Sequence, residues 1–127
     1  MPLVRITLKQ GRSPEQLRTI GEEIYQAMRE TINIPENDRF QAILEQASNN
    51  LIADPDYMGI KRTGDPLFIE ITFRRGRTVE AKQALFRQIA ERLAAKAGIR
   101  KEDILVVLTE NGEADWSFGM GEAQYVK

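Results

Sequence analysis

The chain has 127 residues, of which 42% are hydrophobic, and this is enough to form the core of one domain. Its 18 basic and 19 acidic residues leave a net charge of -1, a balance that argues against nucleic acid or a membrane surface as a partner. The sequence contains no cysteine, which excludes disulfides and thiolate metal sites, and it shows neither a long apolar run nor a signal peptide. We therefore expect a single cytoplasmic domain.

The first segment places Pro2 directly after Met1, at the head of an alternating run from Leu3 to Lys9 that predicts a buried strand. If Met1 is removed, this strand begins with a free secondary amine, and an unperturbed α-amino group has a pKa of about 8. The chain has no histidine and no cysteine, so proton transfer near neutral pH would use this amine or a strongly perturbed Asp, Glu, Lys or Tyr. While Met1 remains, the Pro2 nitrogen is an amide and cannot exchange a proton in this way.

The next segment predicts a helix. A turn is expected at Gly11, and residues 13–16, Ser-Pro-Glu-Gln, supply an N-cap, a proline in the first turn and a capping-box glutamine. The expected inner face of this helix consists of Leu17, Ile20, Ile24, Ala27 and Met28. The helix should end near Asn33, ahead of Pro35, and a second strand should run from about Arg39 to Glu45.

The sequence then repeats itself. An offset of 65 residues pairs Val4 with Ile69, and the match continues without a gap through a strand, a turn, a helix and a second strand. This interpretation gives two repeats, residues 3–46 and 68–111. A loop of residues 47–66 connects them, and residues 112–127 form an irregular C-terminal tail. The alternative is that two unrelated β-α-β units merely share a periodicity.

In the second copy, Thr78 is the expected N-cap and Gly98 ends the helix. The apolar stripe of this helix consists of Leu85, Ile89 and Leu93. Residues 104–108 form a strand apolar enough to be central in a sheet. Within the connecting loop we expect one short strand, around residues 50–53.

The predicted fold class is α/β (α+β). A helix of three to four turns between two strands is what a right-handed parallel crossover requires. Two such β-α-β units side by side give a four-stranded sheet with both helices on one face. The other face of the sheet is left bare, and we expect further subunits to cover it.

Several motifs together resemble the tautomerase superfamily and, within it, the malonate semialdehyde decarboxylase group. They are Pro2, the fused β-α-β repeat, residues 34–41 (Ile-Pro-Glu-Asn-Asp-Arg-Phe-Gln), the arginines that close the third strand, and residues 115–119 (Asp-Trp-Ser-Phe-Gly). The resemblance covers nearly the full length. It implies a homotrimer with an N-terminal proline in a small pocket of each subunit, a small oxo-acid substrate, and neither a cofactor nor a metal.

The resemblance also implies site residues. The group's aspartate falls on Asp38, and its first active-site arginine falls on Arg74. Its second arginine lies two residues further on, where this chain has Gly76, so Arg75 or Arg77 would have to replace it.

The residues themselves leave alternatives open for these basic positions. Arg74, Arg75 and Arg77 at a strand end can hold a small carboxylate by bidentate hydrogen bonds, but they can equally form a solvated basic turn. Arg77 matches Arg12 in the first copy, which suggests a structural role and makes it a weaker candidate than Arg74.

The acidic and aromatic candidates have structural alternatives as well. Asp38 could activate water or polarise a carbonyl, but its repeat partner Asp103 shows that a turn-capping role could also explain it. Trp116 and Phe118 would wall the pocket and exclude water, or would serve only for packing or a subunit contact.

Two classes of function follow. The first is an enzyme, a lyase that decarboxylates a 3-oxo acid with Pro2 as a cation, or an isomerase that interconverts enol and keto acids of the phenylpyruvate type with neutral Pro2 as the base. In both, Pro2, Asp38 and Arg74 would be catalytic, and Arg75, Arg77, Trp116 and Phe118 would bind substrate. The second class is a non-catalytic trimeric binding or structural protein of the same fold, which the departure at Gly76 favours.

Overall fold

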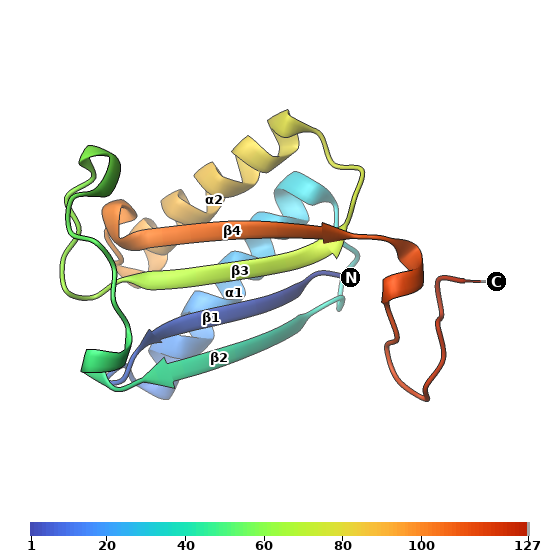
Figure 1. Cartoon of the computed structure of the whole chain (residues 1–127), viewed down its shortest axis with the longest axis horizontal. Coiled ribbons are helices and arrows are strands. Elements are labelled where there is room, and N and C mark those ends of the chain that lie inside the picture. The colour runs from blue at the N-terminus through green and yellow to red at the C-terminus, as the bar shows by residue number, and fades with distance from the viewer. Residues whose placement is uncertain (127) are drawn as a thin grey trace.

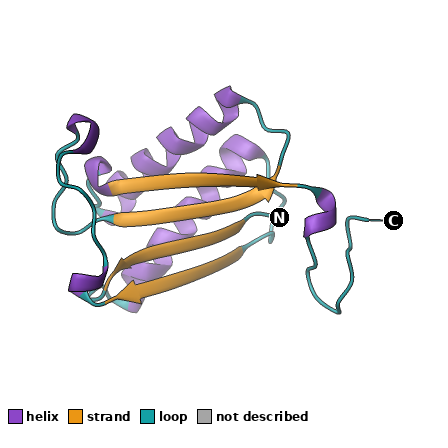
Figure 2. Cartoon of the chain, in the orientation of Figure 1, coloured by secondary structure: helices purple, strands orange, loops and turns teal. Residues whose placement is uncertain are grey.

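The computed structural model describes residues 1–126, which form one four-stranded sheet and two long helices (Figure 1). The elements in chain order are β1 (Leu3–Lys9), α1 (Pro14–Ile32), β2 (Phe40–Gln46), β3 (Leu67–Arg74), α2 (Val79–Ala97) and β4 (Ile104–Asn111). The strand order is β2-β1-β3-β4, with both outer pairs parallel and the central pair antiparallel. Both helices lie on the same side of the strands (Figure 2), so the predicted fold is confirmed.

Each helix begins and ends where its capping residues predict. The Ser13 hydroxyl accepts from the Gln16 amide at 3.1 Å, and the Gln16 side chain accepts from the Ser13 amide at 2.8 Å, which completes a capping box. Asn33 ends α1 in the left-handed conformation, and Gly98 does the same for α2. Thr78 caps the start of α2.

The core lies between the sheet and the helices. The inward residues of the two central strands and of both helices are fully buried: Val4, Ile6, Leu8, Ile69, Ile71, Phe73, Ile20, Ile24, Leu85, Ile89 and Leu93. Burying each of the large side chains contributes about 1.5 to 3 kcal/mol. This layer fixes the register of the central strands, because a shift by one residue would turn every apolar side chain outward.

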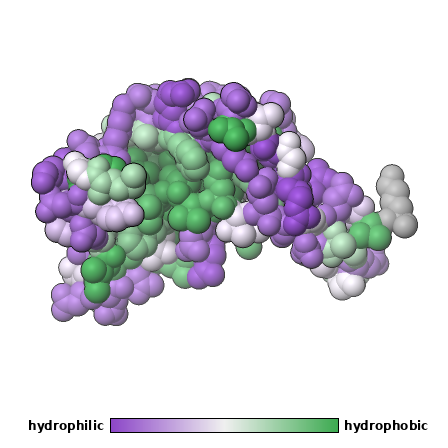
Figure 3. Space-filling model, turned by 45° about the horizontal axis from the view of Figure 1, so that its top comes forward, coloured by the Kyte–Doolittle hydropathy of each residue, from purple (hydrophilic) through white to green (hydrophobic). Residues whose placement is uncertain are grey.

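The opposite face of the sheet is also apolar, yet it is uncovered in the single chain. Leu3, Phe40, Leu105 and Val107 are between 42% and 48% exposed there. Figure 3 shows apolar residues gathered over the middle of the molecule, bordered by hydrophilic residues. An apolar surface of this kind is typical of an interface.

The expectation that residues 104–108 form a central strand is wrong. β4 pairs only with β3 and lies at one edge of the sheet. Its side chains alternate between partly buried and exposed positions, and both sets are apolar because the outward set lies on the bare face. The continuous apolar pattern therefore reflects the uncovered face and not a central position.

The loop between the two halves contains no strand at residues 50–53. Residues 48–50 form a short 3-10 helix instead, and Leu51 is buried behind it. The apolar residues there resembled a strand in the sequence, but Leu51 is buried because it anchors the loop.

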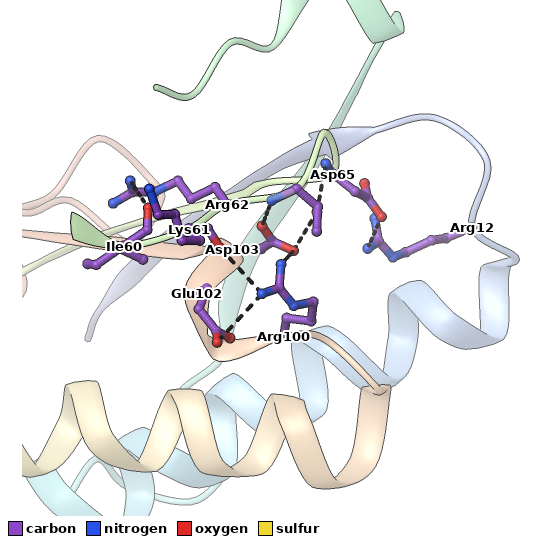
Figure 4. A network of polar contacts seen from close by, with 9 residues as sticks. Arg12, Ile60, Lys61, Arg62, Asp65, Arg100, Glu102 and Asp103 are labelled. Carbon is purple, nitrogen blue, oxygen red and sulfur yellow. Dashed lines mark hydrogen bonds and ion pairs between the residues drawn. The ribbon is translucent and has the colours of Figure 1, made fainter. Parts of the chain in front are cut away.

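This loop is held to the rest of the fold by a polar network (Figure 4). The buried Asp103 carboxylate accepts from the Thr63 amide and from the Thr63 hydroxyl, both at 2.7 Å. Arg100 donates to the Lys61 carbonyl at 3.3 Å, and Arg12 forms an ion pair with Asp65 at 3.0 Å. Asp103 therefore has a structural role in connecting the loop to the start of β4.

Among residues 1–126, no helix has the length and apolar character needed to cross a membrane.

We predict that Asp103→Ala lowers the free energy of unfolding by about 2 to 3 kcal/mol, because two hydrogen bonds to a buried carboxylate are lost. Urea denaturation at a fixed protein concentration measures the change. Asp56→Ala is the matched control, since Asp56 pairs only with exposed Lys61, and its loss should cost less than about 1 kcal/mol. Equal losses in the two variants would contradict a special role for Asp103.

Candidate active site

The register of β1 brings the start of the chain between two candidate residues. Leu3 pairs with Phe40 of parallel β2 and with Thr72 of antiparallel β3. Continuing both ladders by two residues places Met1 beside Asp38 on one side and Arg74 on the other. Figure 1 shows the N-terminus at this end of the sheet, on the side of the molecule where the C-terminal tail extends.

Asp38 is positioned by the connection between α1 and β2. The Asn37 amide donates to the Tyr25 hydroxyl at 3.0 Å, and the Asp38 amide donates to the Pro35 carbonyl at 3.2 Å. The Asp38 side chain is 15% exposed and forms an ion pair with the amine of Met1. The Asp38 carboxylate therefore faces the chain terminus and not its own turn.

The amine at this position titrates well below its ordinary range. Burial, followed by the positive charges of Arg77 and Arg74, lowers the pKa of the Met1 amine from 8.0 to about 6. Met1 is itself buried, with 4% of its surface exposed, and so is Pro2. An amine in this environment gains or loses a proton near neutral pH.

The Arg74 guanidinium is held from two sides. Its Nη1 donates to the Glu113 carboxylate at 3.0 Å, and its guanidinium carbon lies 4.4 Å from the centre of the Tyr125 ring. Arg74 is the last residue of β3, and the backbone amide of the following residue, Arg75, donates to the Asn111 carbonyl at 2.8 Å. These contacts join the end of β3 to the segment that follows β4.

Arg77 lies closer to the terminus than its match with Arg12 suggested. It is the second cause, after burial, of the lowered pKa of the Met1 amine. Its guanidinium donates to the Arg74 carbonyl at 3.0 Å and lies 5.0 Å from the centre of the Phe73 ring. Burial, with the charge of Arg74, lowers its own pKa.

The turn itself explains why no arginine stands between these residues. Gly76 has a φ of +127°, a left-handed value that glycine adopts far more readily than any other residue. Gly11, its partner at the offset of 65 residues, has the same φ of +127°. The basic side chains of this turn therefore come from the positions on either side of Gly76.

The arginines line a cavity of about 570 Å³. Its walls are Arg74, Arg75, Gly76, Arg77, Asn111, Gly112 and Glu113. Arg75 is exposed there, and its guanidinium lies against the backbone at Gly112. The cavity holds three guanidinium groups and one carboxylate, so its charge favours an anion.

Trp116 and Phe118 line a second, mostly apolar hollow of about 390 Å³, together with Leu3 and Phe40. Their rings stack at 5.6 Å, and the Phe118 ring also meets those of Phe40 and Tyr125. The two hollows adjoin at Asn111, whose side chain accepts from the Trp116 indole at 2.7 Å. The structure thus brings Asp38, Arg74 and Arg77 to the terminus, and it places both aromatic residues in a neighbouring hollow.

Four residues of this region were not identified from the sequence: Phe40, Asn111, Glu113 and Tyr125. Phe40 could have been found, because its place in the parallel ladder puts it opposite Leu3. Glu113 and Tyr125 lie outside the strands, where no periodicity indicates which way a side chain faces. Within the described part of the chain, no group of three or more acidic, histidine or cysteine side chains could hold a metal ion.

Family models and similar proteins of known sequence point to the same family. A family model described as a tautomerase enzyme matches residues 38–119, and another with that description matches residues 2–61. The chain is 42% identical over 127 residues, the full length of both proteins, to the probable tautomerase YusQ of Bacillus subtilis strain 168. It is 36% identical to the probable tautomerase YrdN of that organism, over 99% of this chain and 97% of the relative.

A solved structure agrees with this assignment. A malonate semialdehyde decarboxylase inhibited by 3-bromopropiolate is 40% identical to this chain, with a TM-score of 0.92, over 98% of this chain and 94% of that one. With its full length matched at 42% identity and residues 38–119 matched by a tautomerase model, the chain belongs to the tautomerase superfamily of enzymes.

Proposed function

We propose that the chain, once Met1 is removed, is a cofactor-free enzyme that uses the amine of Pro2 to decarboxylate a small 3-oxo acid such as malonate semialdehyde. The observation that carries this proposal is the buried amine of Met1, which pairs with Asp38 and has Arg74 and Arg77 close enough to lower its pKa. We propose that the Pro2 amine takes over these surroundings once Met1 is removed. The 40% identity to a malonate semialdehyde decarboxylase supports the choice of substrate.

Met1 occupies the space that a substrate needs. Its side chain is buried, and its amine takes the place beside the Asp38 carboxylate. Removal of this residue vacates a volume next to Pro2 and converts the Pro2 amide into a secondary amine. The same cleavage therefore creates both the reactive group and the room for its substrate.

In the proposed reaction, Arg74 binds the substrate carboxylate, assisted by Arg77, and Pro2 as a cation donates a hydrogen bond to the 3-carbonyl oxygen. The bond between the carboxylate carbon and C2 breaks, carbon dioxide leaves, and the electron pair forms an enolate that the cation stabilises. The Pro2 ammonium then delivers its proton to C2, which gives the aldehyde and a neutral amine that solvent reprotonates. Asp38 stabilises the ammonium form.

The arginines couple substrate binding to the charge of the amine. Burial and the two guanidinium charges lower the pKa of the Met1 amine, and they would act in the same direction on a Pro2 amine in the free site. A bound carboxylate neutralises part of that positive charge, so it raises the amine pKa and favours the cation in the complex. The cation is then most populated when substrate is present to use it.

A second activity, enol-keto tautomerisation of a phenylpyruvate-type acid, is favoured by two observations. Burial and the arginines lower the pKa of the Met1 amine to about 6, and the same surroundings would keep a Pro2 amine mainly neutral at pH 7, as a base requires. The hollow lined by Trp116 and Phe118 suits an aromatic substituent beside a carboxylate. Both curated relatives are probable tautomerases.

We also propose a homotrimer. The apolar face that includes Leu105 and Val107 needs a cover, and other subunits would supply it. A fused 4-OT structure with this fold, at a TM-score of 0.79, is a symmetric trimer.

We predict that Pro2→Ala lowers turnover of a 3-oxo acid or of phenylenolpyruvate by about 100-fold, because the variant's primary amine is no longer held by the proline ring at the position from which the proton is transferred. Pro66→Ala is the matched control, because Pro66 precedes the equivalent strand but its nitrogen is an amide. Size-exclusion chromatography should give one assembly for both variants. Unchanged rates in Pro2→Ala would refute the proline mechanism, and no turnover of either substrate by the parent would favour a non-catalytic binding protein.

The pH dependence separates the two reactions. If Pro2 acts as a cation, kcat/KM falls as the pH rises through the lowered pKa of the free amine, and kcat falls only at higher pH because bound carboxylate raises that pKa. If Pro2 acts as a base, kcat/KM falls instead as the pH drops through the same pKa. Steady-state rates between pH 5 and pH 9, with both substrates, distinguish these profiles.

Intact mass spectrometry tests the requirement for Met1 removal. We expect specific activity to rise in proportion to the fraction of chains that lack Met1, because only those chains carry a free Pro2 amine. Preparations with retained Met1, treated with a methionine aminopeptidase, supply the comparison. Full activity of chains that keep Met1 would contradict the proposal.

A further inference from the structure

Arg74, which we propose binds the substrate carboxylate, already forms an ion pair with a carboxylate of the protein. Glu113 accepts a hydrogen bond from Nη1 of Arg74 at 3.0 Å, and it is the single acidic residue among those that line the cavity of Arg74, Arg75 and Arg77. The proposed function needs the same guanidinium for the substrate. A substrate carboxylate must therefore compete with Glu113.

The contact is of a kind that a ligand can displace. The Glu113 side chain is 64% exposed and that of Arg74 is 33% exposed, and ion pairs at such exposure are weak. Glu113 holds Arg74 through one nitrogen, whereas a free carboxylate can use two nitrogens of the guanidinium fork. The other side of the guanidinium remains on the Tyr125 ring, so Arg74 keeps its place during the exchange.

Charge gives Glu113 a second effect. Three arginines without an acid would attract dicarboxylates more strongly than monocarboxylates. After displacement from Arg74, the Glu113 carboxylate still lies at the cavity wall, where it repels a second negative group on a ligand.

We propose that Glu113 determines substrate charge in this site: it is an internal counter-ion that a substrate carboxylate displaces from Arg74, and it makes the cavity select monocarboxylates over dicarboxylates. This inference rests on the proposed role of Arg74 in binding the substrate carboxylate. Malonate semialdehyde and phenylpyruvate both carry a single carboxylate, as such a site requires.

The test is equilibrium binding and needs no turnover. Propionate is the monocarboxylate probe and malonate is the dicarboxylate probe, and each is titrated into the full chain while the indole N–H signal of Trp116, the single tryptophan, is followed by NMR. Trp116 reports on the cavity because its indole donates to Asn111, which lines it. The variants are Glu113→Gln, Arg74→Ala and their combination, with Glu122→Gln, an exposed glutamate of the same tail, as the charge-matched control.

We expect Glu113→Gln to tighten propionate binding by about two- to fivefold, the range that loss of an exposed ion pair allows. Malonate binding should tighten by a larger factor, so that the preference for propionate falls. Glu122→Gln should change neither, and in the Arg74→Ala background the substitution of Glu113 should no longer affect propionate.

Three results would overturn the inference. Unchanged or weaker propionate binding in Glu113→Gln would mean that Glu113 only orders Arg74. Equal increases in affinity for propionate and malonate would show that Glu113 does not select by ligand charge. A gain that persists in Arg74→Ala would show a general field effect without displacement. Failure of the proposed function looks different, because propionate binding would then be the same in the parent chain and in Arg74→Ala.

Discussion

The pairing of β1 with both of its neighbours is the constraint on which the site depends. Buried side chains on alternate positions of β1 and β3 fix the register, and that register sets what lies beside the chain terminus. The parallel ladder to β2 supplies Asp38, and the antiparallel ladder to β3 supplies Arg74. A slip of either ladder by one residue would expose the core and would also move Asp38 or Arg74 away from the chain terminus.

The electrostatics of this sheet end rest on opposed effects. Burial and the charges of Arg77 and Arg74 disfavour a protonated amine, whereas the Asp38 carboxylate favours it. Burial and the two arginines lower the pKa of the Met1 amine to about 6, which places its protonation within reach of neutral pH without a histidine. Small changes in local charge, such as the arrival of an anion, therefore shift the protonation equilibrium of the terminal amine.

Much of the fold was predictable from the sequence because its signals are local. Capping residues such as Ser13 and Gly98 predicted the helix ends, and the alternation of apolar and polar residues predicted the first and last residues of β1. The position of β4 was not predictable, since an apolar strand at a bare edge has the same pattern as a central one. For the site, Asp38 and Arg74 followed from motif resemblance, but Glu113 and Tyr125 did not, because irregular backbone gives a side chain no periodic direction. The catalytic roles stay predictions.

The buried Asp103, at the far end of the sheet, occupies the position in the second half of the chain that Asp38 occupies in the first. Asp38 and Asp103 are separated by 65 residues and both face a backbone nitrogen, the terminal amine in one case and the Thr63 amide in the other. Because β1 and β3 run in opposite directions, these carboxylates lie at opposite ends of the sheet. The two halves therefore use these aspartates differently: Asp38 faces the chain terminus, where we propose the chemistry, whereas Asp103 binds the loop that joins the halves.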